Sequence, residues 1–192
     1  MRFLMLMTLL LSLAFPYAAA QANTSPTAAT ELMWDDLMPE DYTLSLYDLF
    51  GESANSLETM DSLDDFSPEA EALMDRMLQV LASAPVREEL DGKIIRIPGF
   101  VVPLEADMNR VTRFFLVPYF GACIHVPPPP SNQIINVHFE PGTRVESLYD
   151  AIWIEGRLST ETFNHEMGTS GYTVEAVIIE PYDFDEAEEG EW

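Results

Sequence analysis

The stretch that decides the fold is GKIIRIPGFVVPLE, Gly92 to Glu105. Ile95, Ile97 and Val101 alternate with other residues around Gly99, which is the period of a half-buried strand. A glycine inside a strand marks a bulge or a sharp bend, and closed barrels need such bends. We therefore expect this stretch to be the first strand of a small barrel.

Four later stretches are also rich in β-branched and aromatic residues. They are TRFFLVP (112–118), QIINVHF (133–139), AIWIEGRLS (151–159) and GYTVEAVIIEP (171–181). In the second of these, Ile135, Val137 and Phe139 fall on one face, and Asn136 and His138 fall on the other. Five short strands without a βαβ rhythm predict a five-stranded barrel of the OB-fold type. An open antiparallel sheet or a fragment of a sandwich is the alternative.

One helix precedes these strands, so the fold class is mainly β with an N-terminal helix. Ser67 is a good N-cap, Pro68 fits the first helical position, and Pro85 ends the pattern. We place this helix within residues 67–86, ahead of a barrel domain that covers residues 87–182. The stripe that we expect to pack consists of Leu73, Met77, Val80, Leu81 and Ala84.

The N-terminus has the features of a secretory signal peptide, which we assign to residues 1–22. Arg2 supplies the positive charge, 13 uncharged residues follow, and PYAAAQA offers cleavage after Ala20 or Ala22. The apolar run is short for a membrane span of about 20 residues, although an uncleaved anchor is the alternative. We expect a periplasmic protein, exported by a cleavable signal peptide and without stable membrane insertion after cleavage.

The net charge of −24 comes largely from an acidic N-terminal arm (23–66) and an acidic tail (183–192). Residues 23–75 carry 14 acids and no base. Such runs repel nucleic acid, which we exclude as a partner. Within the arm, Trp34, Leu37 and Met38 can face one side of a helical turn that Pro39 stops. This turn either docks on the barrel or binds a partner.

The only cysteine, Cys123, lies two residues before His125, and four prolines follow. A thiolate and an imidazole are natural zinc ligands, and residues i and i+2 of an extended chain point to one side. His138 and His165 are the candidates for the further ligands. The prolines would hold the pair rigidly beside the barrel; they are Pro127, Pro128, Pro129 and Pro130.

Two other interpretations of the Cys–His pair stay open. The first is structural, with a buried thiol and a hydrogen-bonded loop histidine. The second is an activated thiolate, for which Asn132 or Asn136 would orient the histidine. NHEMGTSGY (164–172), which carries His165, is typical of a glycine-rich hairpin or turn that could also supply ligands.

Several of these segments resemble an exported bacterial family, the domain of unknown function 3299. They are WDDLMP, GKIIRIPGFVVPLE, FFLVPYFGACIHVPPPPSNQ and IWIEGRL, within residues 31–181. The most specific is the segment from Cys123 to Gln133, with Asn132 beside its end. The resemblance implies a small secreted OB-like barrel. Some members are encoded beside ABC-type export systems linked to zinc limitation, which implies a periplasmic accessory or metal-handling role.

We therefore expect an exported accessory or binding protein that handles zinc beside an envelope transport system. Its partner would be an envelope protein or a transporter component. The first alternative is a protein-interaction module whose Cys-His-Pro motif is purely structural. The second is a thiol-dependent enzyme, so the sequence leaves open whether the protein is an enzyme.

Overall fold

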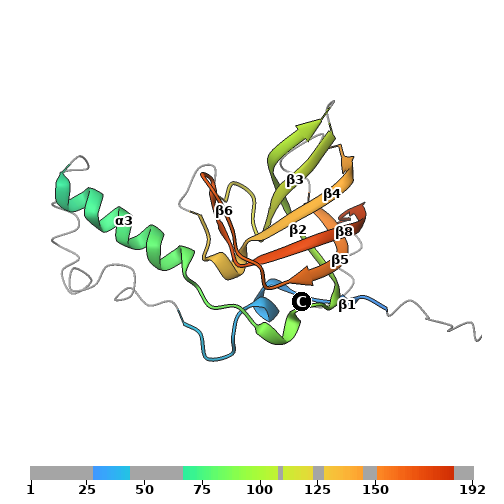
Figure 1. Cartoon of the computed structure of the whole chain (residues 1–192), viewed down its shortest axis with the longest axis horizontal. Coiled ribbons are helices and arrows are strands. Elements are labelled where there is room, and N and C mark those ends of the chain that lie inside the picture. Colours follow the sequence, from blue (N-terminus) through green and yellow to red (C-terminus); the bar gives the residue numbers. More distant parts are fainter. Residues whose placement is uncertain (1–27, 44–66, 108–109, 123–127, 145–150, 184–192) are drawn as a thin grey trace, which may run out of the picture.

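Five long strands form a closed barrel in the computed structural model, which describes residues 28–43, 67–107, 110–122, 128–144 and 151–183 (Figure 1). The strands are β2 (Ile94–Asp107), β3 (Arg110–Val117), β4 (Ile135–Thr143), β5 (Ala151–Ser159) and β8 (Tyr172–Pro181). Their order is β2-β3-β4-β8-β5, and β2 also pairs with β5 and closes the ring. Only the β4–β8 pair of the ring is parallel. The prediction of a mainly β fold with a five-stranded OB-like barrel is confirmed.

Strand β2 closes the barrel because it has a different neighbour along each half. Ile94 to Phe100 pair with β5, and the strand pairs with β3 from Phe100 to Asp107. Gly99 lies where the neighbour changes. A Cβ at this position would lie 2.7 Å from the Leu116 Cγ and 2.9 Å from the Trp34 Cζ2. The glycine expected at a bend therefore allows the Leu116 and Trp34 side chains to approach the strand closely.

The remaining elements are short, apart from one helix. They are β1 (Thr30–Glu31), η1 (Trp34–Leu37), α3 (Pro68–Ala82), η3 (Glu88–Leu90), η4 (Ser131–Gln133), β6 (Phe163–His165) and β7 (Gly168–Ser170). Strands β6 and β7 form an antiparallel hairpin in the chain segment that connects β5 to β8, as one interpretation of NHEMGTSGY predicted. Among the residues described, no helix is long and apolar enough to cross a membrane.

Helix α3 begins as predicted but projects away from the barrel in Figure 1. The Ser67 hydroxyl accepts a hydrogen bond from the Ala70 N–H at 3.1 Å and caps the helix. Only Leu81 and Ala84 of the expected stripe are buried. Only the C-terminal end of the helix lies near the barrel, so the rest of the stripe does not reach the core.

The segment before η1 is attached to the barrel. β1 pairs with β2 in parallel, Leu32 is 7% exposed and Leu37 is fully buried. The Trp34 indole N–H donates to the Pro98 carbonyl at 2.8 Å. The docking interpretation of this part of the acidic arm is therefore confirmed.

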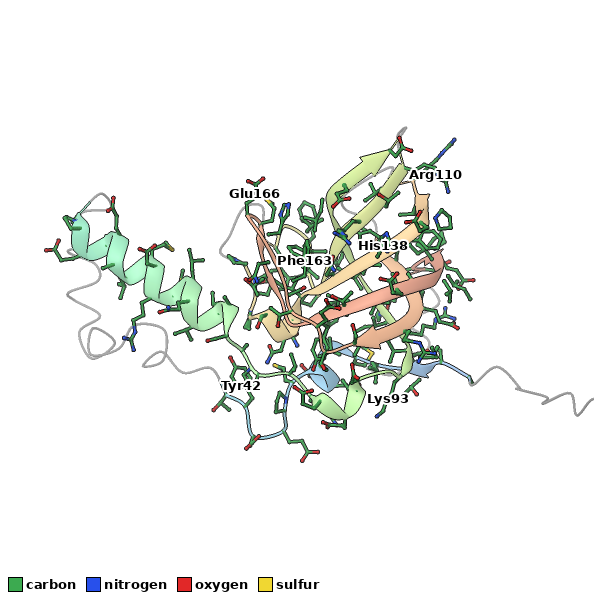
Figure 2. All side chains as sticks on the ribbon, in the orientation of Figure 1. Tyr42, Lys93, Arg110, His138, Phe163 and Glu166 are labelled. Atoms are coloured by element: carbon green, nitrogen blue, oxygen red, sulfur yellow. The ribbon has the colours of Figure 1, made fainter. Side chains whose placement is uncertain are left out.

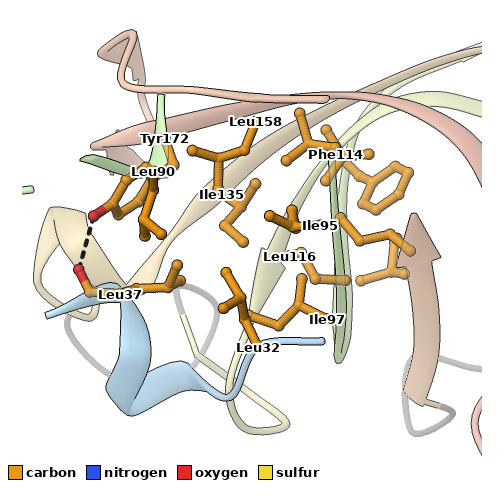
Figure 3. Packing of buried hydrophobic residues seen from close by; sticks show 14 of the residues in the cluster. Leu32, Leu37, Leu90, Ile95, Ile97, Phe114, Leu116, Ile135, Leu158 and Tyr172 are labelled. Atoms are coloured by element: carbon orange, nitrogen blue, oxygen red, sulfur yellow. Dashed lines mark hydrogen bonds between the residues drawn. The ribbon is translucent and has the colours of Figure 1, made fainter. Parts of the chain in front are cut away.

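Two hydrophobic clusters lie on opposite sides of strand β3. Phe114 and Leu116 point into the barrel, whereas Phe115 and Val117 point outward, as the period of a strand requires. Figure 3 shows the inner cluster. The outer group, called the second cluster below, consists of Val102, Phe115, Val117, Ala122 and Ile134, with Phe100, Leu104, Phe163 and Met167 packed against it.

Tyr172 joins three segments that are far apart in the sequence. Its buried hydroxyl donates to the Leu37 carbonyl at 2.8 Å (Figure 3). The same hydroxyl accepts from the Arg87 N–H at 2.6 Å. Burial raises the pKa of this phenol, although the Arg87 N–H opposes the shift. The neutral phenol is the form that the folded protein stabilises.

We expect Tyr172→Phe to lower the free energy of unfolding by about 1–3 kcal/mol, because it leaves the buried Leu37 carbonyl and the partly buried Arg87 N–H without their partner. The folded-state pKa is raised, so the contribution of the phenol is present below about pH 10 and is lost as the pH rises further. Urea unfolding of both proteins between neutral pH and pH 11 measures this. A wild-type excess stability that grows above pH 10 would contradict it.

Candidate functional site

The Cys123–His125 pair and Pro127 lie outside the described residues, but the residues on either side of them are placed. Ala122 is fully buried in the second cluster. Pro128 lies beside the β6–β7 hairpin, since a Cβ at Gly168 would be 3.2 Å from the Pro128 Cβ. The metal site expected at Cys123 and His125 stays a prediction.

The end of the proline-rich segment, residues 131–133, forms hydrogen bonds to two other segments of the chain. In η4, the Ser131 hydroxyl donates to the Ala84 carbonyl at 3.1 Å, and the Asn132 amide donates to the Pro85 carbonyl at 2.9 Å. The Gln133 amide donates to the Trp34 carbonyl at 2.8 Å. Ser131 and Asn132 are buried. These residues therefore hold both the segment after α3 and the N-terminal turn.

His138 lies on the outer face of β4 between two carboxylates (Figure 2). Its Nδ1 is 3.0 Å from the Glu175 Oε2, and its Nε2 is 3.3 Å from the Glu140 Oε1. Both ring nitrogens are thus engaged.

His165 lies on β6, against the second cluster. Its ring stacks on Phe163 with centroids 6.3 Å apart and meets Phe115 edge-on at 6.1 Å. Its Nδ1 accepts the Met167 N–H at 3.2 Å. In the neutral ring the proton therefore lies on Nε2, and that nitrogen has no lone pair for a metal.

The structure does not bring His138 and His165 into one ligand set. Arg113, the register partner of His138, lies 5.1 Å over the Phe163 ring, on which His165 stacks. The described part of the chain contains no group of three or more His, Cys, Asp or Glu side chains placed to hold a metal. Zinc at either histidine would first require its present hydrogen bonds to change.

A small apolar pocket opens where the N-terminal turn meets the barrel. Its volume is about 140 Å³. We call it the aromatic pocket; it is lined by Met33, Trp34, Pro98, Gly99, Phe100, Pro118, Ala151 and Tyr182. These residues come from segments spread over the whole described chain, so no local motif points to the pocket. The one local signal is Trp34 in a turn expected to dock or to bind.

Aromatic side chains continue outward from the pocket. The Phe100 and Phe120 rings meet edge-on at 6.5 Å, and the Trp153 and Tyr182 rings lie 5.4 Å apart. We call Phe120 and Trp153 the aromatic rim. Arg96 lies 4.7 Å over the Trp153 ring and pairs with Glu180 at 3.3 Å.

Acidic residues lie close to the residues that line the pocket. Burial raises the pKa of the Tyr182 phenol, and the charge of Glu31 adds to the shift. Asp35 is exposed directly after Trp34, and Asp183 is exposed directly after Tyr182. Acids thus lie next to the pocket lining at Glu31, Asp35 and Asp183, and the one base described at the rim, Arg96, is paired with Glu180.

A known protein family and a solved structure both match this chain, in agreement with the resemblance seen in the sequence. Residues 34–181 match the family described as "Protein of unknown function (DUF3299)". The chain belongs to this family. A DUF3299 family protein from Pseudomonas aeruginosa PAO1, known from a crystal structure, has 34% sequence identity to this chain. The two structures align with a TM-score of 0.61 over 82% of this chain and 98% of the other. No curated protein matches the chain.

Both the aromatic pocket and the η4 contacts lie almost wholly within the part that matches DUF3299. Of the pocket lining, only Met33 precedes Trp34, and Tyr182 follows the last matched residue. Both features can therefore be compared directly with other members of the DUF3299 family.

Proposed function

We propose that this DUF3299 protein is an exported periplasmic accessory protein that binds another protein of the cell envelope through the aromatic pocket. The observation that carries the proposal is an apolar pocket that opens between exposed apolar side chains. Around it, Met33 is 39% exposed, Tyr119 is 47% exposed and Phe120 is 39% exposed. Aromatic residues and methionine are enriched at protein interfaces, and exposed apolar patches mark interaction sites.

The chemistry of the pocket wall supports binding of an apolar group. The Trp34 indole N–H is already bonded to the Pro98 carbonyl, so the ring offers its apolar surface. Tyr182 is held against Trp153. Rigid aromatic walls lose little conformational freedom when a partner binds, so more of the contact energy contributes to affinity.

Site-specific photo-crosslinking in cells tests this function. With benzoylphenylalanine in place of Met33, we expect a discrete crosslinked species containing an envelope protein. The matched control is the same substitution at Val177, which is 68% exposed on β8 and does not line the pocket. Tyr182→Ala should weaken the Met33 crosslink. The same pattern at both positions, or no product at Met33, would refute the proposal.

Zinc binding at Cys123 and His125 is the second candidate function. Two placements support it: Ala122, which directly precedes Cys123, is buried in the second cluster, and the hairpin that carries His165 packs on that same cluster. His165 is therefore the better candidate for a third ligand, whereas His138 is engaged by Glu140 and Glu175. Ligation through Nε2 would replace the Met167 hydrogen bond at Nδ1.

Metal content of protein purified from the periplasm tests the zinc proposal. We expect about one zinc per chain in the wild type and at least a tenfold loss in a Cys123→Ala, His125→Ala variant, because two of about four ligands are removed. His165→Ala should lose zinc and His138→Ala should keep it. Equal, negligible metal in all four proteins would reject the site.

The thiol-enzyme alternative is separated from zinc binding by alkylation of metal-free protein. A catalytic thiolate would react fast at neutral pH, whereas an ordinary thiol with a pKa of about 8.5 reacts slowly.

A further inference from the structure

We infer that the aromatic pocket takes a polypeptide segment in which one large apolar side chain is flanked by lysines or arginines. This inference rests on the proposed function, because it names the partner chemistry of the same pocket. It is carried by the size of the pocket, its lining and the charges on its borders.

The size of the pocket fits one side chain. Sites for drug-sized ligands usually measure about 300–1,000 Å³, and this pocket measures about 140 Å³. One aromatic or large aliphatic side chain can fill such a space, with the rest of the segment outside, against the aromatic rim. Single anchor residues in apolar pockets carry much of the affinity at protein interfaces.

The lining favours an apolar anchor over a sugar. Only two of the lining residues have polar side-chain atoms, and they are Trp34 and Tyr182. The Trp34 N–H is already used by Pro98. Sugar hydroxyls would therefore lose water without gaining enough partners, and that desolvation is costly.

The charges on the borders favour basic flanks. Glu31 acts on Tyr182 at one wall, and exposed Asp35 follows Trp34 at another. Lysines or arginines beside the anchor would complement these charges, raising both the association rate and the specificity.

The acidic tail of the chain itself is the competing occupant. It begins directly after the pocket wall at Tyr182 and ends in Trp192, so it contains an apolar side chain of suitable size. Its acids, however, would lie among the acids of the borders, and like charges repel. The charge pattern therefore favours a separate, basic segment.

Fluorescence anisotropy of the mature full-length protein with three labelled peptides tests the inference. The probe is GKKGWGKKG; GKKGGGKKG lacks the anchor, and GEEGWGEEG reverses the flanks. We expect the probe to bind at least about tenfold more tightly than either control, and more weakly as ionic strength rises. Equal affinity for the probe and either control, or no binding of the probe up to about 1 mM, overturns the inference.

Variants locate the binding and separate the two occupants. Tyr182→Ala and Glu31→Gln should each weaken probe binding several-fold. Val177→Ala changes an exposed residue of β8 that does not line the pocket, so it should leave binding unchanged. Removal of residues 184–192 should leave affinity equal or lower, since it removes acids. A tenfold gain on removal would show that the tail occupies the pocket and would overturn the inference.

The two proposals fail in different ways. If the peptides do not discriminate while Met33 still crosslinks to an envelope protein, the protein-binding function stands and the basic-anchor chemistry is wrong. If Met33 gives no crosslink, the proposed function itself fails.

Discussion

Gly156→Ala is expected to lower the free energy of unfolding by about 3 kcal/mol or more, because the new methyl group has no space. Gly156 lies in β5, which pairs with β2 on one side and with β8 on the other. A Cβ there would collide with the Glu175 carbonyl oxygen and lie 2.8 Å from the Ala176 Cα. These are backbone atoms of the neighbouring strand, so relief requires the β5–β8 pair to separate.

Urea unfolding monitored by tryptophan fluorescence measures this loss as a lower midpoint. The matched control is Gly92→Ala. Gly92 has a φ of +74° and no atom within 4 Å of a new Cβ, so that variant should lose only about 1–2 kcal/mol from backbone strain. Similar midpoints for the two variants would show that the β5 and β8 backbones leave room for the methyl group.

Phe115→Ala is expected to cost about 3–5 kcal/mol, because it leaves a large cavity in the second cluster. Phe115 is fully buried and meets both Phe163 and His165 edge-on at 6.1 Å. These contacts hold the β6–β7 hairpin on the outer face of β3. The hairpin should therefore loosen before the barrel unfolds.

Hydrogen exchange separates the two effects of Phe115→Ala. Amides of β6 and β7 should exchange much faster at neutral pH, while those of β5 and β8 should change only with global stability. Phe139→Ala is the control, since Phe139 is partly exposed on β4 and belongs to neither cluster. Uniform acceleration throughout the barrel would show that the hairpin and the barrel unfold together.

The candidate sites differ in how far the sequence could predict them. Cys123 and His125 lie two positions apart in the chain and carry distinctive chemistry, so a local pattern suffices to name them. The aromatic pocket has no such pattern, because Trp34, Phe100 and Tyr182 are single aromatic residues in three segments far apart in the sequence. The contribution of Asn132 and Gln133 was also hidden, since their partners are backbone carbonyls of Pro85 and Trp34.

The sequence by itself determined the strands and the class of fold. Alternation places Ile95, Ile97 and Ile135 on one side of their strands, and all three are fully buried in the barrel. Gly99 marked the place where β2 changes its neighbour. These features follow from local geometry, because side-chain period and backbone freedom depend only on nearby residues.

Only the tertiary structure decided which surfaces meet. It showed that the turn around Trp34 packs at Pro98, that α3 leaves the barrel, and that His138 and His165 are engaged separately. Such outcomes depend on strand register and barrel closure, which bring together residues far apart in the chain. The aromatic pocket arises in this way, from the docking of an N-terminal turn onto strands that close only when the whole barrel is formed.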